Sequence, residues 1–527
     1  MKQLSLSVFA LLVLNGFNSQ AQVEKYAETL KEDDLKRHLT YISSDEMEGR
    51  DTGSKGQKKV GQYIESHFKA LDLKPIAPQK DGSLGYQQYF NLYKSGWKES
   101  YVIINGKKKV FFKDYYPVGL VNIPEEKAIE TVFVGYGIKN ENYNDYKGLK
   151  VKDKAVIFLE GSPNDPTNKL KLTASDWTGT NGTKQKAKIA ELMGASFVFE
   201  VSAAEAEKFK TLGAERKAVL SRFNRMALKQ SEKGNEATPM PTFVISEEMA
   251  VQMLDTKLKN LTKYKESLSL KTLKSKKKTS IKIKSERGED LVETSNIMGF
   301  MEGTDQKDEV IVVSAHYDHV GIDDKGQIYN GADDDGSGTT AVLELAEAFA
   351  KAKADGNGPK RSILFLLVTG EEKGLLGSRY FTDVDPIVPL NKIMCDINID
   401  MIGRIDKKHA NNENYVYVIG SDKLSSELHQ ISEEANKKSM NLELDYEFND
   451  PKDPNRFYYR SDHYNFAKNN IPVVFYFTGV HEDYHKPTDD VEKIMFPKYN
   501  KIVKVIFYTI WDLGNRTKKI VVDSNKQ

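Results

Sequence analysis

Three groups of acidic and imidazole side chains stand out because each follows directly after an apolar stretch. The groups are His316-Tyr317-Asp318, Glu371-Glu372 and Asp400, and the stretches that lead into them are rich in Ile, Leu and Val. One carboxylate at the end of a strand means little, but three such groups at three successive strand ends are hard to attribute to chance. Imidazole and carboxylate side chains together are ligands that suit zinc. The pattern therefore predicts a metal site, with zinc as the metal.

Three consecutive aspartates, Asp333, Asp334 and Asp335, lie between the first two groups, in the segment 331–338 that opens a helix. The free N–H groups and the dipole of a helix N-terminus stabilise one carboxylate. They do not account for three that repel one another. A divalent cation would neutralise the excess charge, so this segment is a further source of metal ligands.

The elements that must position these groups alternate between apolar strands and helices from residue 295 onward. Strands are expected at 309–315, 361–369, 392–401 and 471–477, and helices at 338–352, 374–382, 424–439 and 499–513. This alternation is typical of an α/β fold with a mainly parallel central sheet flanked by helices. Ligands of such sheets bind beyond the carboxyl ends of the strands, where the three groups fall.

Five motifs in this region resemble, in the same order, those of the co-catalytic zinc exopeptidases, a family that includes bacterial secreted aminopeptidases and glutamate carboxypeptidase. They are His316-Tyr317-Asp318, the segment 331–338, Thr369-Gly370-Glu371-Glu372, the segment 398–403 and the segment 484–489. Residues 48–54 extend the resemblance upstream. The middle region, with 134–138 and 144–148, resembles the protease-associated domain that is often inserted in this family. The resemblance covers most of the mature chain.

The resemblance implies two zinc ions and a role for each motif residue. His316 and Asp400 would bind the first ion, Glu372 and His485 the second, and Asp334 would bridge the two. Glu371 would be the general base, Asp318 would orient the ring of His316, and Tyr484 would stabilise the oxyanion. Arg460, His463 and Tyr464 are candidates for substrate binding, with Tyr464 as a second choice for the phenol.

A metallopeptidase that acts on peptides, and within that class an aminopeptidase, is the expected function. A carboxypeptidase or dipeptidase would use the same metals and would recognise a free carboxylate, for which Arg456 and Arg460 are available. Three further alternatives are disfavoured. A glutaminyl cyclase lacks the full two-metal set, a non-catalytic receptor has lost ligands, and the order of the motifs does not resemble that of phosphoesterases.

The expected domains follow from the same reading. Residues 1–21 are a predicted signal peptide, 22–115 the first part of the catalytic domain, 116–270 an inserted small β-rich α/β domain, 271–516 the di-zinc catalytic domain and 517–527 a flexible tail. The signal is indicated by Lys2, the apolar run 4–14 and the small residues before Gln22. That run is too short to span a bilayer, and no later stretch is long enough. An exported protein, periplasmic or secreted, is expected.

Composition excludes some partners. The 77 basic and 76 acidic residues give a net charge of +1, which offers no general attraction to nucleic acid or to anionic membranes. The only cysteine, Cys395, rules out an intrachain disulfide and is expected to be a core residue. Of the other histidines, His319 and His409 are expected to be solvated, His481 to be a loop residue, and His38, His67 and His429 to be structural or exposed on helices.

Overall fold

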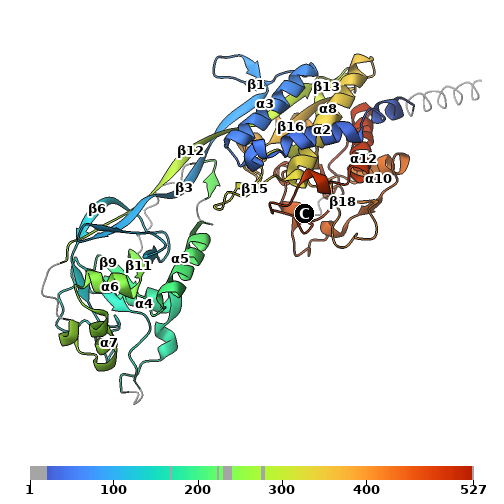
Figure 1. Ribbon diagram of the computed structural model, residues 1–527. Helices are drawn as coiled ribbons and strands as arrows, with labels where there is room; N and C mark the ends of the chain where they lie inside the picture. The colour runs from blue at the N-terminus through green and yellow to red at the C-terminus, as the bar shows by residue number, and fades with distance from the viewer. Residues whose placement is uncertain (1–20, 166–168, 222–224, 230–239, 274–278, 525–527) are drawn as a thin grey trace, which may run out of the picture. The chain divides into compact units, whose positions relative to one another are not determined.

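The computed structural model describes residues 21–165, 169–221, 225–229, 240–273 and 279–524 (Figure 1). The chain divides into two compact units, Met1–Leu92 with Val292–Gln527, and Tyr93–Leu291. The second unit is thus an insertion in the first, and it extends beyond residues 116–270 at both ends. Its boundaries fall within two long strands, β3 (Gln87–Ile104) and β12 (Ile281–Met301). Residues 1–20 of the predicted signal peptide lie outside the described residues.

The first unit is built on a mostly parallel sheet with the strand order β12-β16-β13-β17-β20-β18-β19. The central strands are β16 (Arg361–Val368), β13 (Gln306–His316), β17 (Ile393–Ile399) and β20 (Val473–Phe477), and they run parallel to one another. On one side β12 pairs antiparallel with β16. On the other side β18 (Tyr415–Ile419) pairs antiparallel with β20, and β19 (Glu443–Asp445) runs parallel to β18. This arrangement confirms the predicted α/β fold class.

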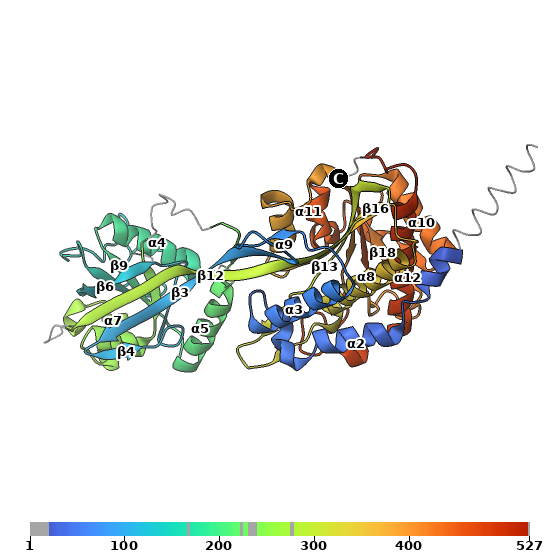
Figure 2. The same ribbon diagram turned by 90° about the horizontal axis from the view of Figure 1, so that it is seen from above.

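Both faces of this sheet are covered, and therefore its central strands are apolar throughout rather than alternating. Odd-numbered residues of β13 such as Ile311 and Val313 pack with helices α2 (Glu32–Ile42), α3 (Lys55–Ala70), α8 (Gly338–Ala354), α10 (Ser426–Lys438) and α12 (Phe496–Asn515). Even-numbered residues such as Val310 and Val312 pack on the opposite face with α11 (His463–Ala467) and its neighbouring loops. Figure 2 shows α2, α3 and α8 gathered on one side of the first unit.

The second unit has its own five-stranded sheet with the order β5-β11-β9-β8-β7. Four strands run parallel: β7 (Thr131–Phe133), β8 (Ala155–Leu159), β9 (Phe197–Val201) and β11 (Thr242–Ile245). The edge strand β5 (Tyr115–Pro117) is antiparallel. Helices α4 (Gly179–Leu192), α5 (Ala206–Ser221), α6 (Glu247–Met253) and α7 (Leu258–Ser267) complete the unit. None of the candidate metal-binding groups among the described residues lies in it.

The C-terminal segment and the cysteine can also be placed. Residues 517–524 form no regular element but are not loose: Ile520 is buried in the core of the first unit, and Asp523 accepts hydrogen bonds from the backbone and the hydroxyl of Ser426.

Cys395 is fully buried in β17, as expected for a core residue. In the part of the chain that is described, no helix is long and apolar enough to cross a membrane.

Candidate metal centre

Five segments bring the predicted ligands together at the carboxyl edge of the first unit's sheet. His316 is the last residue of β13, Glu371 and Glu372 follow β16, and Asp400 follows β17. Asp334 lies in the turn that leads into α8, and His485 lies in the loop after β20. Parallel strands end at one edge of a sheet, so residues far apart in the sequence become neighbours there.

The first group of potential ligands consists of His316, Asp334 and Asp400, all of them buried. The Nε2 atom of His316 lies 3.4 Å from Oδ1 of Asp334 and 3.8 Å from Oδ1 of Asp400. Glu371 stands beside this group, with its Oε2 atom 4.0 Å from the same Nε2. Asp400 is held in turn by the hydroxyl of Ser461, which donates to its Oδ2 at 2.7 Å.

The second group shares Asp334 with the first and contains Glu372 and two imidazoles. The Nε2 atom of His485 lies 3.0 Å from Oδ2 of Asp334 and 3.1 Å from Oε2 of Glu372. His319 approaches the same two carboxylates, at 2.9 Å from Oε1 of Glu372 and 3.7 Å from Oδ2 of Asp334. The expectation of a solvated His319 is therefore wrong: its side chain is fully buried, as are those of Tyr317 and Asp318 before it.

The three consecutive aspartates point in three directions. Asp335 accepts hydrogen bonds from the backbone N–H groups of His316, Gly338 and Met401, and it thereby ties β13, α8 and the end of β17 together. Asp333 accepts from the N–H of Gly403 and lies 3.2 Å from the ring of His481. Only Asp334 of the three faces both groups, which supports the choice that motif order made among them.

Asp489 fixes the turn that carries Asp334. Its carboxylate accepts hydrogen bonds from the backbone N–H groups of Asp333 and Asp334 at 3.1–3.2 Å. Because Asp489 follows His485 by four residues, one carboxylate links the loop of one potential ligand to the turn of another. The peptide bond between Asp334 and Asp335 is cis.

Asp318 was expected to hydrogen-bond the ring of His316, and its backbone oxygen rather than its carboxylate lies within reach of that ring. The Nδ1 atom of His316 lies 3.0 Å from the backbone oxygen of Asp318, whereas the carboxylate oxygen is 3.8 Å away, beyond hydrogen-bonding range. That carboxylate instead accepts from the hydroxyl of Thr52 at 2.7 Å and from the N–H of Glu371 at 3.3 Å. It therefore positions the segment that carries Glu371.

Arg50 is a residue of this region that sequence reasoning missed. It is fully buried and donates hydrogen bonds to four backbone oxygens, those of Ile42, Tyr317, Asn330 and Gly331. Two of these belong to segments adjacent to His316 and Asp334. Its positive charge also stands among the buried carboxylates of Asp334, Asp335, Asp489 and Asp318, which oppose the lowering of its pKa by burial.

A pocket opens onto the first group. Its lining includes four polar residues of the centre, His316, Asp334, Glu371 and Asp400, and also Tyr484 and Arg460. Its apolar lining consists of Met401, Phe457, Phe475, Phe477 and Val480. The structure thus brings two of the predicted outer residues to the pocket. His463 and Tyr464 are not among the described residues that line it. His463 is fully buried and stacks on Phe475 at 4.8 Å, so it is a core residue.

The pKa values follow from burial and from the neighbouring charges. Burial raises the pKa of Glu371 well above 4.5, although His316 opposes the shift. Burial would also raise the pKa of Asp334, but the imidazoles of His319, His316 and His485 outweigh it and hold that pKa well below 3.8. Burial raises the pKa of Tyr484 far above 10, so its hydroxyl remains protonated. Two neighbouring carboxyl groups whose pKa values shift in opposite directions are typical of acid–base catalysis.

The donor set fits divalent metal ions. Two overlapping groups of imidazole and carboxylate share Asp334, as a two-metal site requires of its bridging ligand. Both nitrogens of His319 and the Oε1 atom of Glu372 are buried and have no hydrogen-bond partner among the described residues, although one of these nitrogens lies 2.9 Å from that oxygen. Bound cations would pair with these atoms and neutralise the carboxylates.

Comparison with known proteins also points to a metallopeptidase. Residues 296–510 match the model of "Peptidase family M28". The chain is 26% identical over 237 residues to "Aminopeptidase YwaD" of Bacillus subtilis, 43% of this chain and 46% of that protein. It is 30% identical over 189 residues to "Leucine aminopeptidase 2" of Trichophyton equinum, 35% of this chain and 34% of that protein. The chain thus spans between a third and a half of the length of these relatives.

Solved structures with a similar fold include an aminopeptidase from Aneurinibacillus sp. strain AM-1, with a TM-score of 0.47 and 16% identity over 96% of this chain and 100% of that one. The zinc aminopeptidase BSAP of Bacillus subtilis gives a TM-score of 0.48 and 19% identity over 94% of this chain and 98% of that one. The family model covers the segment that supplies His316, Asp334, Glu371, Glu372, Asp400 and His485. Residues 296–510 of this chain therefore match peptidase family M28.

Proposed function

We propose that this chain is an exported zinc-dependent aminopeptidase that removes N-terminal residues from peptides. The observation that carries the proposal is the pair of ligand groups that share Asp334, with Glu371 beside them at the pocket. His316 and Asp400 would hold one zinc ion, Glu372 and His485 the other, and Asp334 would bridge them. His319 lies equally near to Glu372 and is a further nitrogen donor for the second ion.

Zinc ions bound there would supply Lewis acidity toward the scissile carbonyl and would lower the pKa of a bound water. The chain's own residues would handle the protons. Glu371 faces the pocket, and its raised pKa suits a group that takes a proton from water and delivers it to the leaving amine. Asp318 would hold the segment of Glu371 through its backbone N–H.

Tyr484 would stabilise the oxyanion. It lines the pocket, its hydroxyl stays protonated, and its ring stacks on that of His485 with 3.9 Å between centroids. A fixed hydroxyl that donates to the developing negative charge costs no reorganisation during the reaction. The apolar wall formed by Phe457, Phe475 and Phe477 would accept the side chain of the residue that is cleaved.

One observation favours a second candidate. Arg460 lines the same pocket, and a guanidinium is a good partner for a free carboxylate. A carboxypeptidase or dipeptidase would use this contact to recognise the C-terminus of its substrate. Arg460 also lies over the ring of Phe457, with 4.9 Å between the guanidinium carbon and the centroid, which gives it a packing role in either case.

The two candidates separate in one assay. The zinc-loaded protein is incubated with one peptide in three forms: unblocked, acetylated at the N-terminus, and amidated at the C-terminus. An aminopeptidase cleaves the unblocked and amidated forms and leaves the acetylated form intact. In an aminopeptidase, Arg460→Met should change KM by less than about threefold. In a carboxypeptidase, the same variant should raise KM at least about tenfold. Cleavage of the acetylated form, with the amidated form left intact, would overturn the aminopeptidase proposal.

Export is part of the proposal and has its own support in the predicted signal peptide at residues 1–21. Determination of the N-terminal residue of the protein recovered from outside the cytoplasm tests it, with Gln22 as the expected first residue. A protein that retains Met1 and stays in the cytoplasm would contradict export and leave the peptidase proposal untouched.

A further inference from the structure

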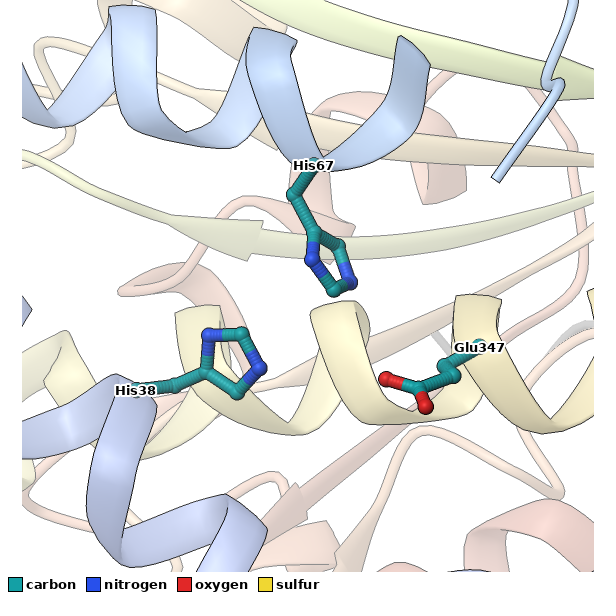
Figure 3. A group of neighbouring side chains, drawn as sticks. All are labelled: His38, His67 and Glu347. Carbon is teal, nitrogen blue, oxygen red and sulfur yellow. The ribbon is translucent and has the colours of Figure 1, made fainter. Parts of the chain in front are cut away.

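A separate group of metal-ligand side chains lies among the helices on one face of the first unit's sheet. His38 is on α2, His67 on α3 and Glu347 on α8, and one donor atom of each lies within 4.8 Å of the other two. Figure 3 shows the two imidazole rings and the carboxylate converging between the three helices. The group shares no residue with the Asp334 centre.

His38 presents one nitrogen to this group. It is 3% exposed, and its Nδ1 atom is 2.7 Å from the hydroxyl of Tyr63. Its Nε2 atom lies 3.3 Å from Oε1 of Glu344, which is one turn before Glu347 on the same face of α8. Tyr63 thus occupies one side of the ring, and the other side faces Glu344 and the guanidinium of Arg37.

Two polar atoms near this space are buried and make no hydrogen bond among the described residues: Nε2 of His67, and Oε1 of Glu344, which lies 3.3 Å from Nε2 of His38. Glu344 itself is only 2% exposed. Buried polar atoms are nearly always paired, so two such atoms in one cluster need an explanation. A cation could be bound by an imidazole lone pair and a carboxylate oxygen at the same time.

The two histidines are in the charge state that metal binding requires. Burial lowers the pKa of both His38 and His67 to about 4, so both rings are neutral at pH 7 and keep a lone pair. Burial raises the pKa of Glu344 to about 8, so this carboxyl group would give up its proton when a cation binds. The competing cation is Arg37, 3.4 Å from Nε2 of His38; it is mostly exposed and pairs with Asp34 at 2.8 Å.

We propose that His38, His67 and Glu347 bind one divalent transition-metal ion, with Glu344 beside them as a fourth donor. Two imidazoles and carboxylate oxygens favour zinc over calcium or magnesium, which prefer oxygen ligands alone. Tetrahedral zinc with bonds of about 2.0–2.1 Å places its ligand atoms roughly 3.3 Å apart. The donor atoms now lie up to 4.8 Å apart, and rotation of the side chains would bring them to that distance. Glu347 is exposed, so its side chain can rotate.

The ion would hold three helices together. Its ligands come from α2, α3 and α8, which are separate in sequence and share one hydrophobic core. A site closed by four protein ligands leaves no position for substrate, so its role would be structural rather than catalytic. Nothing in this proposal depends on the peptidase activity.

The test counts zinc in the full chain. Metal-free protein is loaded with Zn²⁺, freed of excess by gel filtration and analysed by plasma mass spectrometry, for wild type, His67→Gln, Glu347→Gln and His429→Gln. His429 is the matched control, since it is a partly buried helical histidine near a single carboxylate, that of Glu433. We expect His67→Gln and Glu347→Gln to hold one zinc fewer than wild type at unchanged peptidase activity, and His429→Gln to match wild type.

Equal zinc content in wild type and in the folded Glu347→Gln and His67→Gln variants would overturn the proposal. Glu347→Gln keeps the test decisive if His67→Gln fails to fold, because an exposed glutamate tolerates an isosteric change. Anomalous diffraction at the zinc edge gives an independent answer. A peak between His38, His67 and Glu347 is expected, and its absence from crystals that show zinc at Asp334 would also overturn the proposal.

Discussion

Replacement of Arg50 by lysine is expected to loosen the metal centre without touching a ligand. Arg50 donates four hydrogen bonds to backbone oxygens, and two of the acceptors belong to Tyr317 and Gly331, next to the segments of His316 and Asp334. Lysine keeps the charge, but a compact ammonium group cannot reproduce the planar fork of a guanidinium. Some of the four oxygens will lose their donor inside the protein.

The loss of stability in Arg50→Lys follows from these four hydrogen bonds. If lysine reaches two of the four oxygens, the other two remain unpaired, and each costs roughly 1–3 kcal/mol. The free energy of unfolding should therefore fall by about 2–6 kcal/mol, a large share of the roughly 5–15 kcal/mol that is typical of a folded domain. Zinc affinity should fall about 10- to 100-fold, as is usual when groups that orient ligands are replaced.

The matched control is Arg361→Lys. Arg361 is also fully buried and donates to the backbone oxygens of Leu513 and Arg516 and to Glu309, none of which carries a predicted ligand. Urea titration should show that both variants are destabilised. Competition with a chelator should show weaker zinc binding for Arg50→Lys alone. Wild-type zinc affinity in Arg50→Lys, or an equal loss in Arg361→Lys, would refute the reasoning.

Three further predictions concern catalysis and pH. Glu371→Gln should lower kcat/KM by about 10²–10⁴-fold at unchanged zinc content, and a smaller effect would remove Glu371 as the base. Tyr484→Phe should lower kcat about 100-fold with little change in KM, whereas a rise in KM alone would assign the hydroxyl to substrate binding. Burial lowers the pKa of His463 to about 3 from 6.5, so the unfolded chain binds more protons between these values and stability falls as the pH drops through this window, by up to about 4 kcal/mol. His463→Phe should flatten this dependence in urea titrations from pH 7 to pH 3, and an unchanged slope would contradict it.

Much of the first unit could be predicted from sequence because its strongest signals are local. The apolar runs before His316, Glu371 and Asp400 are buried strands, and the parallel order brings their carboxyl ends together. Strand β18 was not predicted, although residues 415–419 are all β-branched or aromatic, because the alternation of strand and helix breaks there. Its antiparallel pairing with β20 depends on a distant partner. Pairing between remote segments is a tertiary property.

The outer residues of the centre were harder to predict for a physical reason. Arginine is mostly exposed in proteins, so residue type gave no sign that Arg50 is fully buried. His319 and His409 were expected to be solvated and are both buried, since loop paths rather than local pattern decide burial after a strand end. His463 precedes a strand in a polar segment, and only the tertiary structure places its ring on Phe475.

The buried position of Cys395 has a practical consequence. Burial raises the pKa of its thiol far above 9, and its side chain has no exposed surface, so it will not react with maleimides while the protein is folded. The chain contains no other cysteine. Any cysteine introduced at an exposed position, such as Leu192 on α4, becomes the single reactive thiol of the native protein. The unmodified chain therefore serves directly as the background for attaching one fluorophore or spin label at a chosen site.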